Sequence, residues 1–232
     1  MNAVAPIIKS SEIIYPSSDG EPVAESYDHF YAISVTLEVL KQYLSNRRAT
    51  VLANQFLYYA QGFPKLRVAP DVMVIFDVEP GGRDNYKTWE EGQVPKVIFE
   101  MTSPGTKSED QVIKKGLYER MDVEEYWLFD PRGGWIPEKL RGYKLGVEGY
   151  ELIGDNCSKV LQLRLEVEGK LIGFYREDNG EKLLIPDELV SALNEERQRA
   201  EAERQRAEAE RQRADELESL LALYREQFGE LP

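Results

Sequence analysis

Apolar positions recur every three or four residues near the start of the chain, which predicts a helix. This helix would span residues 26–46, and its apolar positions are Phe30, Ile33, Leu37, Leu40 and Leu44. Three apolar runs then follow, at residues 51–59, 69–78 and 96–101, and runs of this length between turn residues are typical of strands. The run 69–78 is apolar on both faces, which indicates a strand inside a sheet.

A second helix is expected after the third strand. Thr106-Lys107-Ser108-Glu109 has the spacing of a capping box, and Val112, Leu117 and Met121 would face the core. A fourth strand is predicted at 125–129, followed by strands at 142–147, 150–153, 161–166 and 171–175. The order α-β-β-β-α-β, followed by β-hairpins, predicts a mixed α/β core with a sheet extension.

The end of the chain is an internal repeat of seven residues. Residues 197–203 read RQRAEAE, 204–210 repeat it, and 211–217 read RQRADEL. In a helix, the repeat aligns small residues along one side and places mostly glutamates three residues after them. Two interpretations of the tail therefore stay open. One is a solvated single helix with i,i+4 pairs of Arg and Glu. The other is a weak coiled coil through residues 217–228.

Chain length and composition limit the class of protein. The 232 residues, 42% of them hydrophobic, suit one domain with an appendage. We expect an extended segment at 1–20, a folded domain at 21–189 and a charged helix at 190–232. Cys157 is the only cysteine, and no apolar run approaches the ~18 residues of a membrane span, so a cytoplasmic protein without membrane contact is expected.

The charge of the chain is strongly acidic. Its formal net charge is −13, and the region from residue 190 onward contributes 7 Arg and 11 acids, or −4 of that total. The acidity therefore belongs mainly to the folded part. It argues against tight non-specific DNA binding by a monomer, because nucleic-acid binders usually carry a basic surface.

Two carboxylates stand at the ends of consecutive predicted strands. Asp71 follows Pro70 and opens the run Val72–Phe76, and Glu100 ends the run that begins at Val97. Burying a lone carboxylate costs several kcal/mol, so a buried acid here must be paired, capped or metal-bound. Each acid taken alone also fits a strand end that faces solvent.

The helix after Glu100 carries Asp110, Lys114 and Tyr118 at four-residue intervals. Two acids at one sheet edge can hold a hard divalent cation, and a nearby lysine can orient a water molecule. This combination is typical of metal-dependent phosphodiester hydrolysis. The alternative for Lys114 is a surface i,i+4 pair with Asp110.

Taken in order, the motifs resemble a known family. Pro70-Asp71, Glu100-x-Thr-Ser, Asp110-x3-Lys114-x3-Tyr118 and Glu125-Tyr126-Trp127 are similar to those of a largely cyanobacterial restriction-endonuclease family in the PD-(D/E)XK nuclease superfamily. The resemblance covers residues 21–131, and the hairpins and tail are similar to extensions on many members. It implies an α/β fold, with a restriction-endonuclease-like mixed sheet flanked by helices.

The resemblance also implies roles for single residues. Asp71 and Glu100 would bind Mg²⁺, or Mn²⁺ in its place, together with the carbonyl of Met101 and the side chain of Glu25. Thr102 stands where the superfamily pattern has its lysine, so the catalytic lysine would be Lys114 from the following helix, with Lys115 as the fallback.

The sequence therefore predicts a Mg²⁺-dependent endodeoxyribonuclease, acting on DNA as a homodimer joined through its tail. One alternative is a non-catalytic nuclease-fold scaffold that works through its C-terminal helix, which the acidic charge favours. Another is a nuclease that acts on RNA. His29, the only histidine, cannot build a His-rich metal site or a catalytic triad alone, and we expect it to be a surface or core residue of the first helix.

Overall fold

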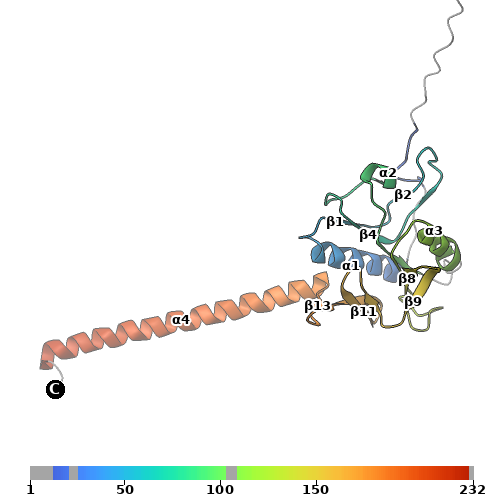
Figure 1. Ribbon diagram of the computed structural model, residues 1–232. Helices are drawn as coiled ribbons and strands as arrows, with labels where there is room; N and C mark the ends of the chain where they lie inside the picture. Colours follow the sequence, from blue (N-terminus) through green and yellow to red (C-terminus); the bar gives the residue numbers. More distant parts are fainter. Residues whose placement is uncertain (1–12, 21–25, 103–108, 230–232) are drawn as a thin grey trace, which may run out of the picture. The chain divides into compact units, whose positions relative to one another are not determined.

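The structure is a computed structural model, and it describes residues 13–20, 26–102 and 109–229 (Figure 1). The side chains of residues 109–111 and 228 are outside this description. The chain separates into two compact units, residues 1–183 and 184–232.

The first helix, α1, spans Tyr27–Tyr43, close to the predicted range. The side chain of Ser26 caps it by accepting a hydrogen bond from the backbone N–H of His29. The helix packs against β1 (Ala49–Leu52), β4 (Val72–Phe76) and β6 (Val97–Met101) of one sheet and against β12 (Leu171–Arg176) of another. Its buried positions are Ala32, Ile33, Val35, Thr36, Val39 and Leu40. Phe30, expected on the core face, is instead 58% exposed.

A six-stranded mixed sheet forms the centre of the first unit, in the order β1-β4-β6-β7-β8-β9. The pair β6 and β7 is parallel, and the other neighbours are antiparallel. The mixed α/β fold expected from the sequence is thereby confirmed. The strands are β1 Ala49–Leu52, β4 Val72–Phe76, β6 Val97–Met101, β7 Glu125–Phe129, β8 Leu140–Gly146 and β9 Gly149–Ile153.

A short π-helix, η1 (Glu109–Lys114), and the helix α3 (Lys115–Arg120) connect the parallel strands β6 and β7. The capping box expected at residues 106–109 lies outside the described residues and side chains. Leu117 and Met121 pack against the core as predicted. The prediction for Val112 is wrong, because this side chain is 71% exposed. The π-helix changes the angular spacing of side chains, which an α-helical pattern does not anticipate.

The expected strand at 51–59 is two strands. After β1 the chain turns at Asn54, whose φ is 52°, and residues 57–58 form β2 in a separate small sheet. Asparagine adopts this left-handed conformation more readily than most residues, so the chain can leave the main sheet here. The small sheet has the order β3-β2-β5, with β3 at Arg67–Val68 and β5 at Tyr86–Lys87.

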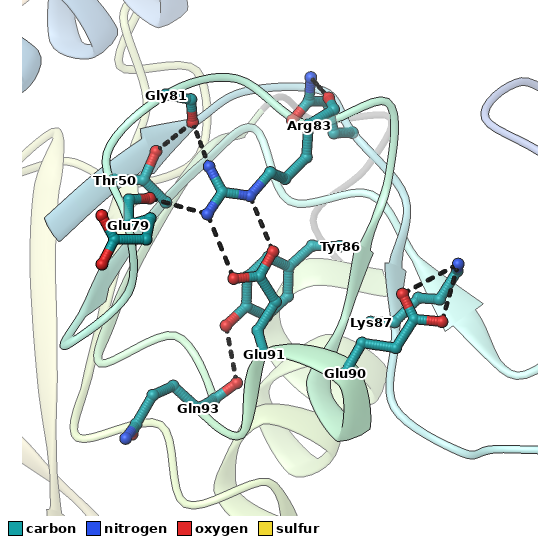
Figure 2. Close-up of polar contacts among 10 residues, drawn as sticks. Thr50, Glu79, Gly81, Arg83, Tyr86, Lys87, Glu90, Glu91 and Gln93 are labelled. Atoms are coloured by element: carbon teal, nitrogen blue, oxygen red, sulfur yellow. Dashed lines mark hydrogen bonds and ion pairs between the residues drawn. The ribbon is translucent and has the colours of Figure 1, made fainter.

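Arg83 holds the loop between β4 and the short helix α2 (Thr88–Glu91), as Figure 2 shows. Its guanidinium group donates to both carboxylate oxygens of Glu91, at 2.8 and 3.1 Å, and to the carbonyls of Glu79 and Gly81. The hydroxyl of Thr50 donates to the same Gly81 carbonyl at 2.7 Å, which ties the loop to β1. The carboxylate–arginine contact is bidentate, the stronger form of such a pair.

Both faces of the central sheet are covered. On one face, Met73, Ile75, Ile98 and Tyr126 form a core cluster with Tyr118 of α3. The opposite face packs on α1 and on a second sheet, whose Phe174 meets Phe99 edge-on. The strands of this second sheet are β10 Cys157–Ser158, β11 Leu163–Glu168, β12 Leu171–Arg176 and β13 Lys182–Leu183. The strands β11 and β12 form the hairpin expected at 161–175, whereas the hairpin expected at 142–153 extends the central sheet as β8 and β9.

The second unit is dominated by one helix, α4, which spans Pro186–Phe228 and has 43 residues. It begins with proline, whose missing N–H costs nothing in the first turn, and Glu188 accepts a hydrogen bond from the N–H of Ile185. Every side chain at 189–227 is exposed. The long C-terminal helix predicted from the repeat is thus confirmed. In the described part of the chain, no helix is long and apolar enough to cross a membrane.

Candidate active site

Asp71 and Glu100 lie at the same end of two paired strands. In the antiparallel pair β4–β6, Val72 is opposite Phe99, so the residue before Val72 and the residue after Phe99 are neighbours. The backbone N–H of Met101 donates a hydrogen bond of 2.7 Å to Oδ2 of Asp71. The strand pairing therefore places the two acids side by side, although 29 positions separate them in the sequence.

Glu100 is almost completely buried and is held by two donors from the following helical segment. Lys114 Nζ lies 2.9 Å from Oε2, and the hydroxyl of Tyr118 donates to Oε1 at 2.7 Å. The Glu100 side chain is only 1% exposed, so these contacts satisfy the need of a buried carboxylate for partners. Burial, and next the neighbouring Glu100 carboxylate, raise the pKa of Tyr118 well above its usual value, so it stays a hydrogen-bond donor.

Lys114 and Lys115 contact different parts of the protein. The side chain of Lys114 is 14% exposed and meets Glu100, whereas the Lys115 ammonium group lies 3.9 Å from the centre of the Tyr143 ring. Lys114 is the last residue of the π-helix, a type of turn that is frequent at functional sites. Of the two lysines considered from the sequence, the one that reaches Glu100 is Lys114.

Met101 and Thr102, which follow Glu100 in the chain, are both buried. Met101 is 1% exposed and joins the site through its backbone. Thr102, at the position of the superfamily lysine, is 1% exposed, and its backbone N–H donates to the carbonyl of Phe129. Glu25 lies outside the described residues, as does the side chain of Asp110.

His29 reaches the site from α1, which the sequence did not indicate. Its Nε2 lies 3.6 Å from Oδ2 of Asp71, and the two side chains are 18% and 13% exposed. The preceding residue, Asp28, forms ion pairs of 2.9 Å with Arg132 and with Lys170, which fasten the start of α1 to two loops. Hydrogen bonds from these two cations lower the pKa of Asp28.

Comparison with known proteins identifies the family of this chain. The sequence model of the Uma2 family, described as putative restriction endonuclease, matches residues 9–169. The chain belongs to this family. The family expected from the motifs is thus confirmed, and so is the restriction-endonuclease-like fold class.

One solved structure similar to this Uma2 member is the crystal structure of a putative nuclease belonging to DUF820 from Anabaena variabilis. The two chains are 14% identical, with a TM-score of 0.43 over 61% of this chain and 77% of the other. No curated protein matches the sequence.

The side chains of this Uma2 member suit a hard divalent cation in chemical type. Asp71 and Glu100, at neighbouring positions of two paired strands, carry carboxylate oxygens, the ligand type that Mg²⁺ and Mn²⁺ prefer. Within residues 26–102 and 109–229, no three His, Cys, Asp or Glu side chains gather closely enough to hold an ion. Both oxygens of Glu100 instead meet Lys114 and Tyr118. Ion binding would therefore require this carboxylate to exchange at least one of these partners.

Proposed function

We propose that this Uma2 member is a Mg²⁺-dependent endonuclease that hydrolyses phosphodiester bonds in DNA. Asp71 and Glu100 would hold the ion, with the carbonyl of Met101 and the side chain of Glu25 as further ligands. The observation that carries the proposal is the placement of Asp71 and Glu100 at one sheet edge with Lys114 Nζ 2.9 Å from the buried acid. Mn²⁺ is the expected substitute for Mg²⁺.

The roles of the side chains follow from their positions. A bound divalent ion polarises the scissile phosphate and lowers the pKa of an attacking water. Lys114 would hold that water beside Glu100 and offset the negative charge that grows on the phosphoryl oxygens. Tyr118 donates to Glu100 Oε1 and so fixes the carboxylate on one side. Asp71 is fixed in the same way by the N–H of Met101.

Nicking of supercoiled plasmid tests the proposal. We expect cleavage with Mg²⁺ or Mn²⁺, no cleavage with excess chelator, and a loss of about 100-fold or more in Glu100→Gln, which keeps the shape of the side chain but removes its charge. A catalytically silent wild-type protein, or a Glu100→Gln protein as active as wild type, would contradict it. Single-stranded and structured RNA in parallel reactions distinguish DNA from RNA as the substrate.

A second candidate is a non-catalytic scaffold that acts through α4. The net charge of −13 and the exposure of every side chain from 189 to 227 favour it, because neither feature serves the binding of a polyanion. In this case the protein would bind a partner through the helix and would cleave no nucleic acid with any divalent ion.

We also propose that the protein forms a homodimer and is cytoplasmic. The apolar end of α4 would join two copies, so that a dimer presents two sites to a duplex. The exposed residues that would form this contact are Leu217, Leu220, Leu221, Leu223 and Tyr224.

A single cysteine, Cys157, suits a reducing compartment, which supports a cytoplasmic protein.

A further inference from the structure

Nε2 of His29 approaches Oδ2 of Asp71 without reaching hydrogen-bond distance. Nε2 and Oδ2 are 3.6 Å apart, which exceeds the 2.7–3.2 Å of an ordinary hydrogen bond between nitrogen and oxygen and lies within the range of an ion pair. Both side chains are mostly buried. The same Oδ2 atom also accepts the 2.7 Å hydrogen bond from Met101, which holds the carboxylate in place.

Two atoms that bind one metal ion have a similar separation. Ligands about 2.1–2.2 Å from a shared ion, at angles between a right angle and the tetrahedral angle, lie roughly 3.0–3.6 Å from each other. Imidazole nitrogen is the commonest protein ligand for metals. We therefore propose that His29 is a nitrogen ligand of the metal site and binds the ion through Nε2 beside Asp71. This inference rests on the proposed function, because it extends the same site.

The start of α1 holds His29 in a fixed position. Ser26 caps the helix on the N–H of His29, and the ion pairs of Asp28 with Arg132 and Lys170 fasten the first turn. A ligand needs such support, because an ion binds tightly only when its ligands are already placed. The imidazole ring therefore approaches Asp71 from a rigid element.

A nitrogen ligand changes which ion the site prefers. Mg²⁺ favours oxygen ligands and keeps much of its water shell, whereas first-row transition-metal ions accept imidazole readily. With His29 as a ligand, the site would discriminate against Mg²⁺ more strongly than two carboxylates and a carbonyl would. The substitution of this one residue should then alter ion preference as well as affinity.

The experiment uses full-length protein without a histidine tag, loaded with Mn²⁺. His29 is the only histidine, so nitrogen modulation in the pulsed electron paramagnetic resonance spectrum of Mn²⁺ reports on it directly. We expect a ¹⁴N coupling that changes to a ¹⁵N coupling when the protein is grown with ¹⁵N-labelled histidine. This readout needs no substitution and no catalytic turnover.

Binding measurements on a variant complete the test. We expect His29→Ala to weaken Mn²⁺ binding by about tenfold or more and Mg²⁺ binding by less. Phe30→Ala, the removal of an exposed neighbour on the same helix, should change neither affinity.

Mn²⁺ bound without histidine nitrogen coupling would overturn the role of His29 and leave the proposed nuclease site intact. If wild-type protein binds neither ion, the metal site itself is wrong and this inference falls with it.

Discussion

Lys114 Nζ lies 2.9 Å from Oε2 of Glu100, a carboxylate that is 1% exposed. A cation this close to a buried acid satisfies the charge of the acid. In the proposed metal site, the same ammonium group would lie beside the ion. Its position is set by the π-helix, and the adjacent lysine contacts Tyr143 instead. Lys114 and Lys115 are adjacent but contact different residues, so the effects of substituting each one can be compared directly.

Lys114→Ala should lower plasmid nicking with Mg²⁺ by about 100-fold, the usual effect of removing one group that stabilises transition-state charge. Lys115→Ala should keep wild-type activity, because Lys115 lies over the Tyr143 ring and away from Glu100. Initial rates on supercoiled plasmid measure both. Equal rates for Lys114→Ala and wild type would remove Lys114 from the mechanism.

Asp71→Asn should abolish cleavage but leave the fold intact. The amide keeps the shape of the side chain and can still accept the hydrogen bond from Met101, but it lacks the charge that attracts a divalent cation. Asp77→Asn is the control. It makes the same change beyond the other end of β4, at an exposed position whose φ of 61° suits asparagine. Circular dichroism and nicking assays should separate the two variants, and full activity of Asp71→Asn would contradict the site.

Tyr118→Phe should destabilise the protein more than Tyr150→Phe. Tyr118 donates to the charged Glu100 at 2.7 Å, whereas Tyr150 donates at the same distance to the neutral carbonyl of Val123. A hydrogen bond to a charged group contributes roughly 1.5–3 kcal/mol, and one to a neutral group about 0.5–1.5 kcal/mol. Urea unfolding at neutral pH measures both losses. Equal losses would contradict a larger contribution from the hydrogen bond to Glu100.

The Arg83–Glu91 pair should make stability depend on pH. The hydrogen bond from Arg83 lowers the pKa of Glu91 from its ordinary 4.5. The folded state therefore holds this proton less tightly than the unfolded state. The stabilisation is fully present above the ordinary value and is lost as pH falls through the lowered one.

Arg83→Met tests this dependence, because it keeps the side-chain stem and removes the charge. Between about pH 6 and about pH 3.5, the variant should lose less unfolding free energy than wild type. Arg48→Met is the control, since Arg48 and Glu79 form a pair that is 65% and 80% exposed, and exposed pairs contribute little. A variant of Arg83 with the wild-type pH dependence would show that the pair does not stabilise the fold.

The tail should determine the oligomeric state through its end segment alone. Two copies of the repeat in register would place Glu203 and Glu210 against their equivalents, which is repulsive. Leu217 and Tyr224 continue the glutamate column and Leu221 continues the alanine column, and all three are exposed and can bury apolar surface. We therefore expect full-length protein to dimerise and both the 194–232 deletion and the Leu217→Glu, Leu221→Glu double variant to be monomeric by light scattering. If the full-length protein and the 194–232 deletion variant have the same oligomeric state, the tail is not the dimerisation element.

Local patterns in the sequence predict the elements that depend on local chemistry. The strand Glu125–Phe129 has its predicted bounds, and the helix after Ser26 begins where a capping residue precedes an apolar period. The neighbouring positions of Asp71 and Glu100 could also be expected, because both stand at ends of strands that follow each other.

Other features depend on contacts between distant parts of the chain, so local patterns do not reveal them. The break at Asn54 follows from the pairing of β2 with β5, about thirty residues away. The approach of His29 to Asp71 depends on how α1 packs against the sheet, and a lone histidine in a helix carries no sign of it. The exposure of Val112 depends on a π-helix, which has no distinct apolar period.

Because Lys114 ends the π-helix at Glu109–Lys114, the direction of its side chain depends on the number of residues in this segment as well as on their types. Each residue in an α-helix advances the side-chain direction by about 100°, while a π-helix closes its hydrogen bonds over one residue more per turn. Shortening this segment by one residue, with every functional side chain retained, would let it close as an ordinary α-helix and rotate Lys114 relative to Glu100. In the proposed nuclease, a single-residue deletion in this segment should therefore abolish activity as completely as the removal of the Lys114 side chain.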